Sequence, residues 1–449
     1  MKRKIYDRLL DWKNKDNGTT AVLIEGARRI GKSYIAEEFA RNEYESNIVI
    51  DFSIAPSDIS ELFEYYLYHL DELFDRLQIY YQVKLIPRKS VIIFDEVQFC
   101  PKARSAIKHL VADGRFDYIE TGSLISIKRN VKDILIPSEE ITLEMYPMDF
   151  EEFLWAMGNY TLMPFIRKQF ESKKPMGESL HRQALDYFRH YMIVGGMPQA
   201  VEKFIQNQDY DEVDRVKRRI IDLYRNDIRK FADGEELKVA AIFDEIPSQL
   251  QRHEKKFRMS ALAEHARMRQ YSNAFFWLSD AKIINCCFNS TAPNIGLRLN
   301  EDRTTLKCYM GDTGLLISMA FDEYGDEIKD LYKKLVFGKL EVNEGMLVEN
   351  IVAQMLKAAG HKLYFFSKSS EDSENRMEID FLIAKSKITS RHNISPIEVK
   401  SGERYAFTSL RKCRAKYGQY LATSYLIHDK DLKIEDDIVF VPIYMTSLL

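Results

Sequence analysis

The eight residues from Gly26 to Ser33 constrain the fold of this chain more than any other stretch. They read GARRIGKS and fit the pattern G-x-x-x-x-G-K-[ST]. The apolar run at 20–25 before them predicts a short buried strand, and residues 34–41 after them have the pattern of the first turns of a helix. Strand, glycine-rich loop and helix together are the context in which this pattern binds phosphate, which makes a chance match the weaker alternative.

The chemistry of the loop predicts its ligand. Gly26 and Gly31 let the backbone curl so that successive N–H groups point at one anion, and the helix that begins near Lys32 adds its positive dipole end. We expect Lys32 to reach the β and γ phosphates of ATP and the Ser33 hydroxyl to bind Mg²⁺. The predicted nucleotide-binding residues are Gly26, Ala27, Arg28, Arg29, Ile30, Gly31, Lys32, Ser33 and Tyr34.

A second buried strand is predicted at 90–95, where four apolar residues lead into Asp95 and Glu96. Asp95 at the strand tip would share the Mg²⁺ with Ser33, and Glu96 would polarise a water for attack on the γ phosphate, as a catalytic residue beside Lys32. The alternative is a strand that simply ends in solvated acids. The glycine-rich loop upstream favours the functional interpretation.

A third strand, predicted at 116–120, ends in Thr121, Gly122 and Ser123. A hydroxyl at this strand tip would lie beside the γ phosphate and distinguish ATP from ADP. Ser123 is the first candidate and Thr121 the second. An ordinary Ser/Thr turn explains the same residues equally well.

The loop, the IIFDE segment at 92–96, the TGS strand end and LEMYPMDFEEFL at 143–154 together resemble the ATPase domain of the AAA family. More narrowly, they resemble bacterial and archaeal AAA-type ATPases that carry a C-terminal domain of unknown function. The resemblance implies a parallel sheet in which the Asp95 strand lies beside the Thr121 strand. In many such relatives an arginine of a neighbouring subunit completes the site, which would make this chain a homo-oligomer. On chemistry alone the candidates are Arg129 and Arg298.

The middle of the chain predicts two helices, at 261–266 and 271–281, and two strands, at 283–288 and 306–310. Two helices and a β-hairpin make a winged helix, and the family resemblance supports this. Arg267, Arg269 and Gln270 would begin a helix that reads a DNA groove. Phe275 to Trp277 crowd the same helix, so a purely structural role is supported equally well.

Three signals near the C-terminus predict a metal site for phosphodiester chemistry. Glu349 lies in a predicted helix, Asp380 at the centre of a strand at 377–383, and Glu398 and Lys400 on one face of a strand at 395–400. Asp380, Glu398 and the Val399 carbonyl would bind one Mg²⁺, Glu349 a water or a second metal, and Lys400 would stabilise the reacting phosphate. The predicted catalytic residues are Asp380, Glu398 and Lys400, and the predicted metal ligands are Glu349, Asp380 and Glu398.

This set resembles the restriction-endonuclease-like family, but fold and cleavage are separate expectations. Lys400 would alternatively neutralise Asp380 as a structural pair. A basic cluster downstream, interleaved with aromatic residues, would follow a phosphate backbone. Its members are Arg404, Tyr405, Phe407, Arg411, Lys412, Arg414, Lys416 and Tyr417. The charge-rich stretch 214–230 would either contact a phosphate backbone or form a solvated helix face with interleaved acidic partners. The solvated face is favoured, because charge runs usually solvate.

The expected fold class is therefore α/β: a P-loop NTPase parallel sheet, a helical linker, a winged helix and a C-terminal α/β restriction-endonuclease-like domain. The predicted domains cover 1–155, 156–236, 237–338 and 339–449, because 449 residues exceed one hydrophobic core. A net charge of -3 does not predict a general electrostatic attraction of the chain to nucleic acid. Five cysteines without a C-x-x-C pair, and no apolar run near the ~20 residues that a bilayer needs, predict a cytoplasmic protein without a membrane partner.

Two functions follow as hypotheses. In the first, an ATP-binding and hydrolysing AAA-type ATPase couples its nucleotide state to a DNA-directed nuclease-like domain. In the second, the chain is a non-catalytic ATP-dependent regulatory or winged-helix DNA-binding protein whose nuclease-like domain only binds. Both require the Asp95 strand tip to face Ser33.

Overall fold

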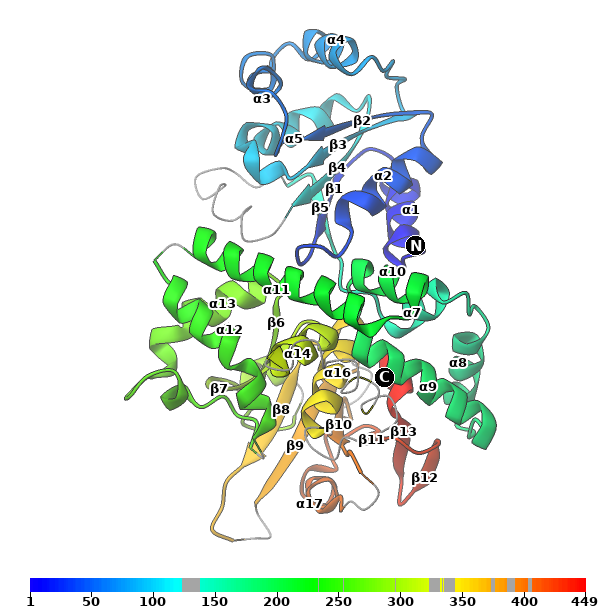
Figure 1. Cartoon of the computed structure of the whole chain (residues 1–449), viewed down its shortest axis with the longest axis vertical. Helices are drawn as coiled ribbons and strands as arrows, with labels where there is room; N and C mark the ends of the chain where they lie inside the picture. Colours follow the sequence, from blue (N-terminus) through cyan, green and yellow to red (C-terminus); the bar gives the residue numbers. More distant parts are fainter. Residues whose placement is uncertain are drawn as a thin grey trace. The chain divides into compact units, whose positions relative to one another are not determined.

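A five-stranded sheet carries the glycine-rich loop in the computed structural model of the chain (Figure 1). The structure describes residues 1–122, 138–232, 234–252, 254–294, 296–322, 332, 334, 344–372, 376–385, 392–402 and 406–449. The chain divides into a first unit, Met1–Tyr146, and a second unit, Pro147–Leu449.

The sheet of the first unit is parallel throughout, in the order β2-β3-β4-β1-β5. Its strands are β1 (Ala21–Glu25), β2 (Ser46–Asp51), β3 (Ser90–Asp95), β4 (Asp117–Gly122) and β5 (Glu140–Glu144). β1, β3 and β4 are buried at every position, as expected of parallel strands covered on both faces. The predicted neighbourhood is confirmed: the Asp95 strand pairs with the Thr121 strand, which pairs with the strand that enters the loop.

The helices of the first unit differ from the predicted pattern at one place. They are α1 (Ile5–Asp16), α2 (Lys32–Glu43), α3 (Ser57–Tyr65), α4 (Leu70–Tyr81) and α5 (Pro101–Asp113), with a 3₁₀ turn η1 (Val97–Phe99). Apolar and aromatic residues at helical spacing across 58–82 predict a single core-facing helix. This prediction is wrong, because the chain leaves the helix at Tyr66 and re-enters it at Leu70. Both helices bury side chains in the same hydrophobic cluster, so the helical spacing continues across the break.

The second unit begins with helices, as the predicted linker does, and further helices lie between its strands. They are α7 (Phe150–Ala156), α8 (Leu162–Ser172), α9 (Glu178–Val194), α10 (Pro198–Asn207), α11 (Tyr210–Phe231), α12 (Glu236–Gln251), α13 (Met268–Asp280), α14 (Thr313–Ala320), α16 (Glu344–Ala358) and α17 (Thr408–Tyr417). A fixed turn separates α9 from α10. A Cβ on Gly196 would lie 2.2 Å from the Met148 carbonyl oxygen, and the Gly196 N–H donates to Asp312 Oδ2 at 2.6 Å.

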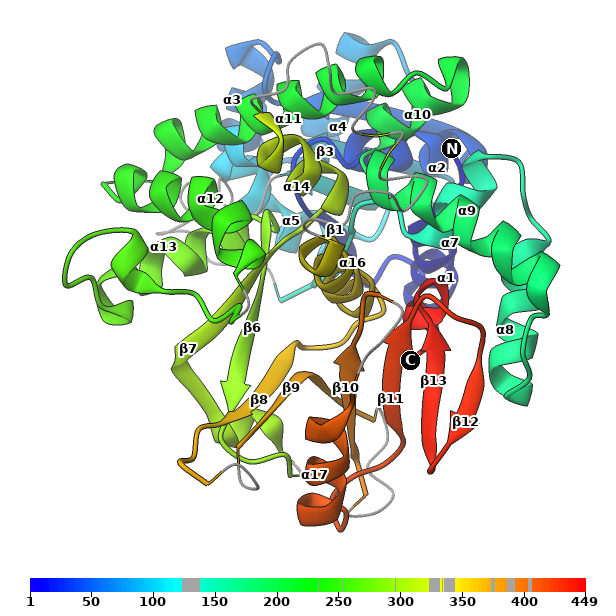
Figure 2. The same ribbon diagram turned by 60° about the horizontal axis from the view of Figure 1, so that its bottom comes forward.

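One mixed, eight-stranded sheet spans the rest of the second unit, in the order β12-β13-β11-β10-β9-β8-β6-β7 (Figure 2). Its strands are β6 (Ile284–Ser290), β7 (Glu301–Met310), β8 (Tyr364–Lys368), β9 (Met377–Ala384), β10 (Ile394–Val399), β11 (Ser424–His428), β12 (Lys433–Glu435) and β13 (Ile438–Pro442). α16 packs against β6, β7 and β10.

The hairpin β6–β7, expected as the wing of a winged helix, pairs through β6 with β8 of the same sheet. The expected boundary between 338 and 339 therefore separates strands of one continuous sheet. The prediction of a helix at 261–266 is wrong. The 3₁₀ turn η2 (Met259–Ala261), followed by turns, occupies the chain before α13. Further 3₁₀ segments are η3 (Leu297–Asn300) and η5 (Ile443–Leu448). Among helices of the described ranges, none has the length and apolarity to cross a bilayer.

Candidate nucleotide site and carboxylate cluster

The glycine-rich loop joins β1 to α2 and depends on both of its glycines. A Cβ on Gly26 would lie 2.3 Å from the Met145 carbonyl oxygen, closer than any side chain tolerates. Gly31 has a φ of 91°, in the left-handed region that a side chain disfavours. Ile30 between them is fully buried and anchors the loop. The sequence pattern and the local geometry therefore agree.

Lys32 lies against the inside of its own loop. Its Nζ donates to the Gly26 carbonyl at 3.1 Å and to the Ala27 carbonyl at 2.9 Å. The residue is buried. An ammonium group held among loop carbonyls is positioned to exchange them for phosphate oxygens, because these are stronger, charged acceptors.

The two predicted metal ligands of the first unit lie in contact. Ser33 Oγ donates to Asp95 Oδ1 at 2.7 Å, across 62 residues of sequence. Thr121 Oγ1 donates to the same Asp95 oxygen, so the second candidate at that strand tip reaches the site. Ser123, the first candidate, lies outside the described residues. Hydroxyl and carboxylate oxygens are the ligands that Mg²⁺ takes, so these residues fit the expected ion.

Glu96 follows Asp95 directly and is held by a neighbour that the sequence did not single out. Its φ of 50° is in the left-handed region, which is rare outside glycine and is often found at functional sites. The side-chain amide of Gln98 donates to Glu96 Oε2, and Gln98 itself is buried. Gln98 therefore orients the candidate base from two residues away.

Arg3 is a second contributor that the sequence did not reveal. Its guanidinium is buried and donates to the Ile30 carbonyl at 2.8 Å and to the Tyr146 carbonyl at 2.6 Å. It thereby ties the glycine-rich loop to the chain that follows β5. No local pattern marks such an arginine, because its partners lie 27 and 143 residues away.

Replacing Arg3 with alanine is expected to weaken ATP binding by about tenfold. The loss of this buried, charged donor leaves the Ile30 and Tyr146 carbonyls without its hydrogen bonds and releases the glycine-rich loop from the chain after β5. Arg8→Ala is the matched control, since Arg8 donates to the Glu144 carbonyl at an exposed position outside the loop. Equilibrium titration with a fluorescent ATP analogue measures both dissociation constants. Equal affinities of the two variants would contradict the role of Arg3.

The second unit brings acidic residues together around an unpredicted lysine. Lys307 on β7 is almost fully buried, and its Nζ lies 3.2 Å from Glu349 Oε1, 3.1 Å from Glu378 Oε1 and 3.5 Å from Asp380 Oδ1. We call Glu349, Glu378 and Asp380 the carboxylate cluster. Although burial acts in the opposite direction, the ammonium groups of Lys307 and Lys255 lower the pKa of Glu349 to about 2. The cluster thus contains two of the predicted metal ligands and a cation of its own.

The third predicted ligand, Glu398, is engaged differently. Its Oε1 pairs with Lys400 Nζ at 2.7 Å, so Lys400 neutralises Glu398 rather than Asp380. Asp380 Oδ2 accepts the Val399 N–H at 2.9 Å. Burial raises the pKa of Glu398, and among the described residues its second oxygen, Oε2, is buried without a hydrogen-bond partner. Within those residues no three His, Cys, Asp or Glu side chains are arranged to hold a metal ion.

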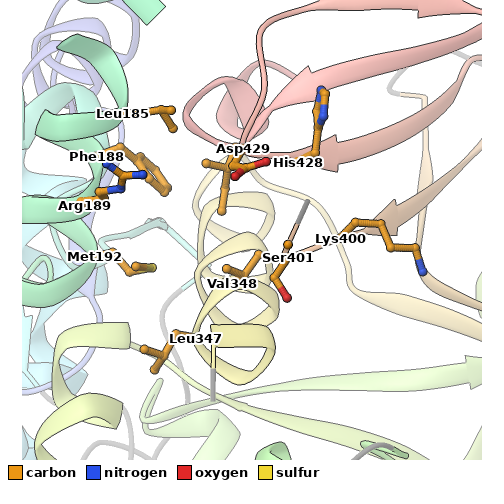
Figure 3. A pocket seen from close by; sticks show the side chains of 12 residues that line it. Leu185, Phe188, Arg189, Met192, Leu347, Val348, Lys400, Ser401, His428 and Asp429 are labelled. Carbon is orange, nitrogen blue, oxygen red and sulfur yellow. The ribbon is translucent and has the colours of Figure 1, made fainter. Parts of the chain in front are cut away.

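A cavity of about 100 Å³ opens at the carboxyl ends of β10 and β11 (Figure 3). Apolar side chains of α9 and α16, among them Phe188 and Leu347, line the cavity together with His428 at the end of β11 and Asp429 directly after it. The Lys400 side chain extends away from the α9 residues, consistent with its contact to Glu398. Lys400 therefore lines the cavity while its ammonium group is engaged by Glu398.

The predicted DNA contacts are partly satisfied within the chain. Arg411 pairs with Asp436 at 2.7 Å, and Arg414 pairs with Asp437 at 3.5 Å. Arg404 and Tyr405 of the same basic cluster lie outside the described residues, as does Arg129. On α13, Phe275 is buried and Trp277 Nε1 donates to the Phe231 carbonyl at 3.2 Å, so that helix has packing roles. Nucleic-acid binding stays a prediction.

Comparison with known proteins gives three matches along the chain. Residues 18–154 match the family model of an AAA domain. Residues 185–324 and 344–446 match two domains of unknown function, DUF8612 and DUF4143. No curated protein matches the sequence at a significant level.

A solved structure, the Walker-type ATPase of Pyrococcus abyssi, is 14% identical over 71% of this chain and 95% of that chain, with a TM-score of 0.40. At that level of similarity nothing about this chain follows from it. The family match and the Ser33–Asp95 geometry are independent of it. Residues 18–154 are therefore similar to an AAA domain, and within them the glycine-rich loop meets Asp95 at the tip of β3.

Proposed function

We propose that the first unit binds ATP together with Mg²⁺ and hydrolyses it. The observation that carries this proposal is the 2.7 Å contact between Ser33 Oγ and Asp95 Oδ1, which joins the glycine-rich loop to the tip of β3. A strand tip with an acid, facing a loop that offers amides and an ammonium, is the arrangement that phosphoryl transfer needs. The match of residues 18–154 to an AAA domain supports the same proposal.

The residues divide the work as follows. The loop amides and Lys32 bind the phosphates, and Ser33 and Asp95 would hold the ion, which neutralises charge on the phosphates when bound. Glu96, oriented by Gln98, accepts a proton from the attacking water. Thr121 hydrogen-bonds Asp95 and fixes its position at the strand tip.

Replacing Lys32 with alanine is expected to weaken ATP binding by about 100-fold, since the phosphates lose their charged donor. Hydrolysis at sub-saturating ATP falls at least as far. Arg41→Ala, in the last turn of the same helix, is the matched control and should leave both unchanged. Tight ATP binding by the Lys32 variant, measured by calorimetry, would refute the nucleotide site.

In the second unit, the contacts of Asp380 favour a binding module over a nuclease. Asp380 already accepts hydrogen bonds at both oxygens, from Lys307 and from the Val399 amide. A DNA-directed nuclease remains the second candidate, favoured by the unpartnered oxygen of Glu398. In either case the nucleotide state of the first unit would be transmitted to the second through differential contacts to the γ phosphate.

A further inference from the structure

Three carboxylates from two separate elements converge on a single ammonium group. Glu349 comes from α16, and Glu378 and Asp380 come from β9, with Lys307 Nζ between 3.1 and 3.5 Å from one oxygen of each. Lys307 exposes 1% of its side chain. A lysine this deeply buried is unusual unless it is paired, and here it has three acidic partners.

Carboxylates that gather around one point, partly removed from water, repel one another and need a cation. Without one, burial and mutual repulsion raise their pKa values until a proton binds, and divalent metal ions commonly fill this role in proteins. Burial and the charge on Glu349 keep the pKa of Asp380 above its usual value, although Lys307 acts in the opposite direction. Because its Nζ lies 3.1–3.5 Å from one oxygen of each carboxylate, the ammonium group is placed where such an ion would lie.

A second lysine compensates part of the acidic charge. Lys255 Nζ pairs with the second oxygen of Glu349 and donates to the Gly345 carbonyl at 2.9 Å. Lys256 Nζ lies 3.8 Å from Glu378 Oε2 but only 2.9 Å from Glu254 Oε1, so its charge belongs chiefly to Glu254. The Tyr309 hydroxyl donates to Glu349 Oε1. Removal of Lys307 leaves the carboxylate cluster without its central cation, around a space lined by carboxylate oxygens.

We propose that the ammonium group of Lys307 occupies the position of a divalent metal ion in the carboxylate cluster, and that this position becomes a divalent-cation site when the ammonium group is removed. The inference does not depend on ATP hydrolysis by the first unit. It implies that the native second unit requires no divalent ion at the carboxylate cluster and does not cleave DNA there.

The geometry fits an exchange of ammonium for metal. Carboxylate oxygens lie about 2.0–2.6 Å from Mg²⁺ or Ca²⁺, against 3.1–3.5 Å from Lys307 Nζ, so each carboxylate must close in by about 1 Å. Glu378 exposes 34% of its side chain and can make this shift. Asp380 stays oriented by the Val399 N–H during the change.

The test uses the full chain without nucleotide and Mn²⁺ as the probe. Lys307→Ser is expected to unfold at a lower temperature than the native protein, and Mn²⁺ is expected to raise its transition by about 5 °C. The native protein and the matched control Lys433→Ser, which removes an exposed lysine paired with Glu435 in the same sheet, should show no such shift. Adding Asp380→Asn to Lys307→Ser should abolish the rescue.

Two results would overturn the inference. The first is a folded Lys307→Ser protein that is indifferent to Mn²⁺. The second is a native protein that binds Mn²⁺, or cleaves DNA with Mn²⁺, in a way that Asp380→Asn removes. If Lys307→Ser does not fold, electron paramagnetic resonance titration of Mn²⁺ into the native protein and Asp380→Asn decides: equal binding supports the inference and unequal binding rejects it.

Discussion

Replacing Glu96 with glutamine is expected to slow ATP hydrolysis by about 10²–10⁴-fold while the dissociation constant for ATP changes by no more than about twofold. The amide has nearly the shape of the carboxylate but cannot accept the proton of the attacking water. Glu96 follows the strand tip that holds Asp95, and its carboxylate accepts a hydrogen bond from Gln98, while Lys32 and the loop amides are the groups expected to set affinity. Rate and affinity should therefore separate in this variant.

Single-turnover hydrolysis together with ATP titration makes the measurement. Glu45→Gln is the control, because Glu45 is exposed in the same unit and pairs with Lys89. If Glu96→Gln hydrolyses ATP at the native rate, Glu96 is not the base. If instead the loss appears in affinity alone, Glu96 acts in binding, and the assignment of its role fails.

The nucleotide site was predictable because its chemistry follows the chain locally. A glycine-rich pattern fixes Lys32 and Ser33 in one loop, and an apolar run fixes Asp95 at a strand end. The carboxyl ends of neighbouring parallel strands meet at one edge of a sheet, which is why Ser33 and Asp95 come together. Of the two hydroxyls predicted at the next strand tip, Thr121 contacts Asp95, and Ser123 lies outside the described residues.

The interactions that the sequence did not reveal join segments that are far apart in the chain. Arg3 reaches residues 27 and 143 positions away, and Lys307 reaches Asp380 across 73 positions. A single arginine or lysine carries no pattern, so only the folded chain identifies its partners. The hairpin at 284–310 illustrates the same limit for strands, since alternation and turn residues do not distinguish a wing from the edge of a larger sheet.

The charge-rich helix α11 was predicted to present its charged residues to water, and part of that prediction is wrong. Arg225 of this helix is paired at the surface, as expected. Asp214 and Lys217, however, are buried. Asp214 Oδ1 accepts from Ser318 Oγ at 2.6 Å and from the Tyr332 hydroxyl at 2.5 Å. Periodicity alone does not separate a buried ionic network from a solvated one, because both place charges at helical spacing.

Replacing Asp214 with alanine is expected to destabilise the second unit by about 3–5 kcal/mol, the cost of leaving a buried charge without its partner. Lys217 Nζ donates to the Ile193 carbonyl at 2.9 Å and to Tyr332 at 3.1 Å. Burial lowers the pKa of Lys217 to about 8, against the opposing pull of Asp214. Without that carboxylate the ammonium group keeps its burial penalty and loses the charge that most offsets it, and Arg218 Nε loses the carboxylate oxygen 2.5 Å away.

Urea unfolding followed by circular dichroism measures the change in the free energy of unfolding. Asp222→Ala is the matched control, because Asp222 lies on the same helix, exposes 68% of its side chain and contacts Arg225 at 3.7 Å. Exposed pairs of this kind contribute at most about 1 kcal/mol. If the two variants lose equal stability, the network around Asp214 is not a buried ionic one, and α11 is held by its apolar side chains alone. If only Asp214→Ala lowers the free energy of unfolding strongly, the stability of α11 depends on buried charged residues that the sequence pattern predicts to be in water.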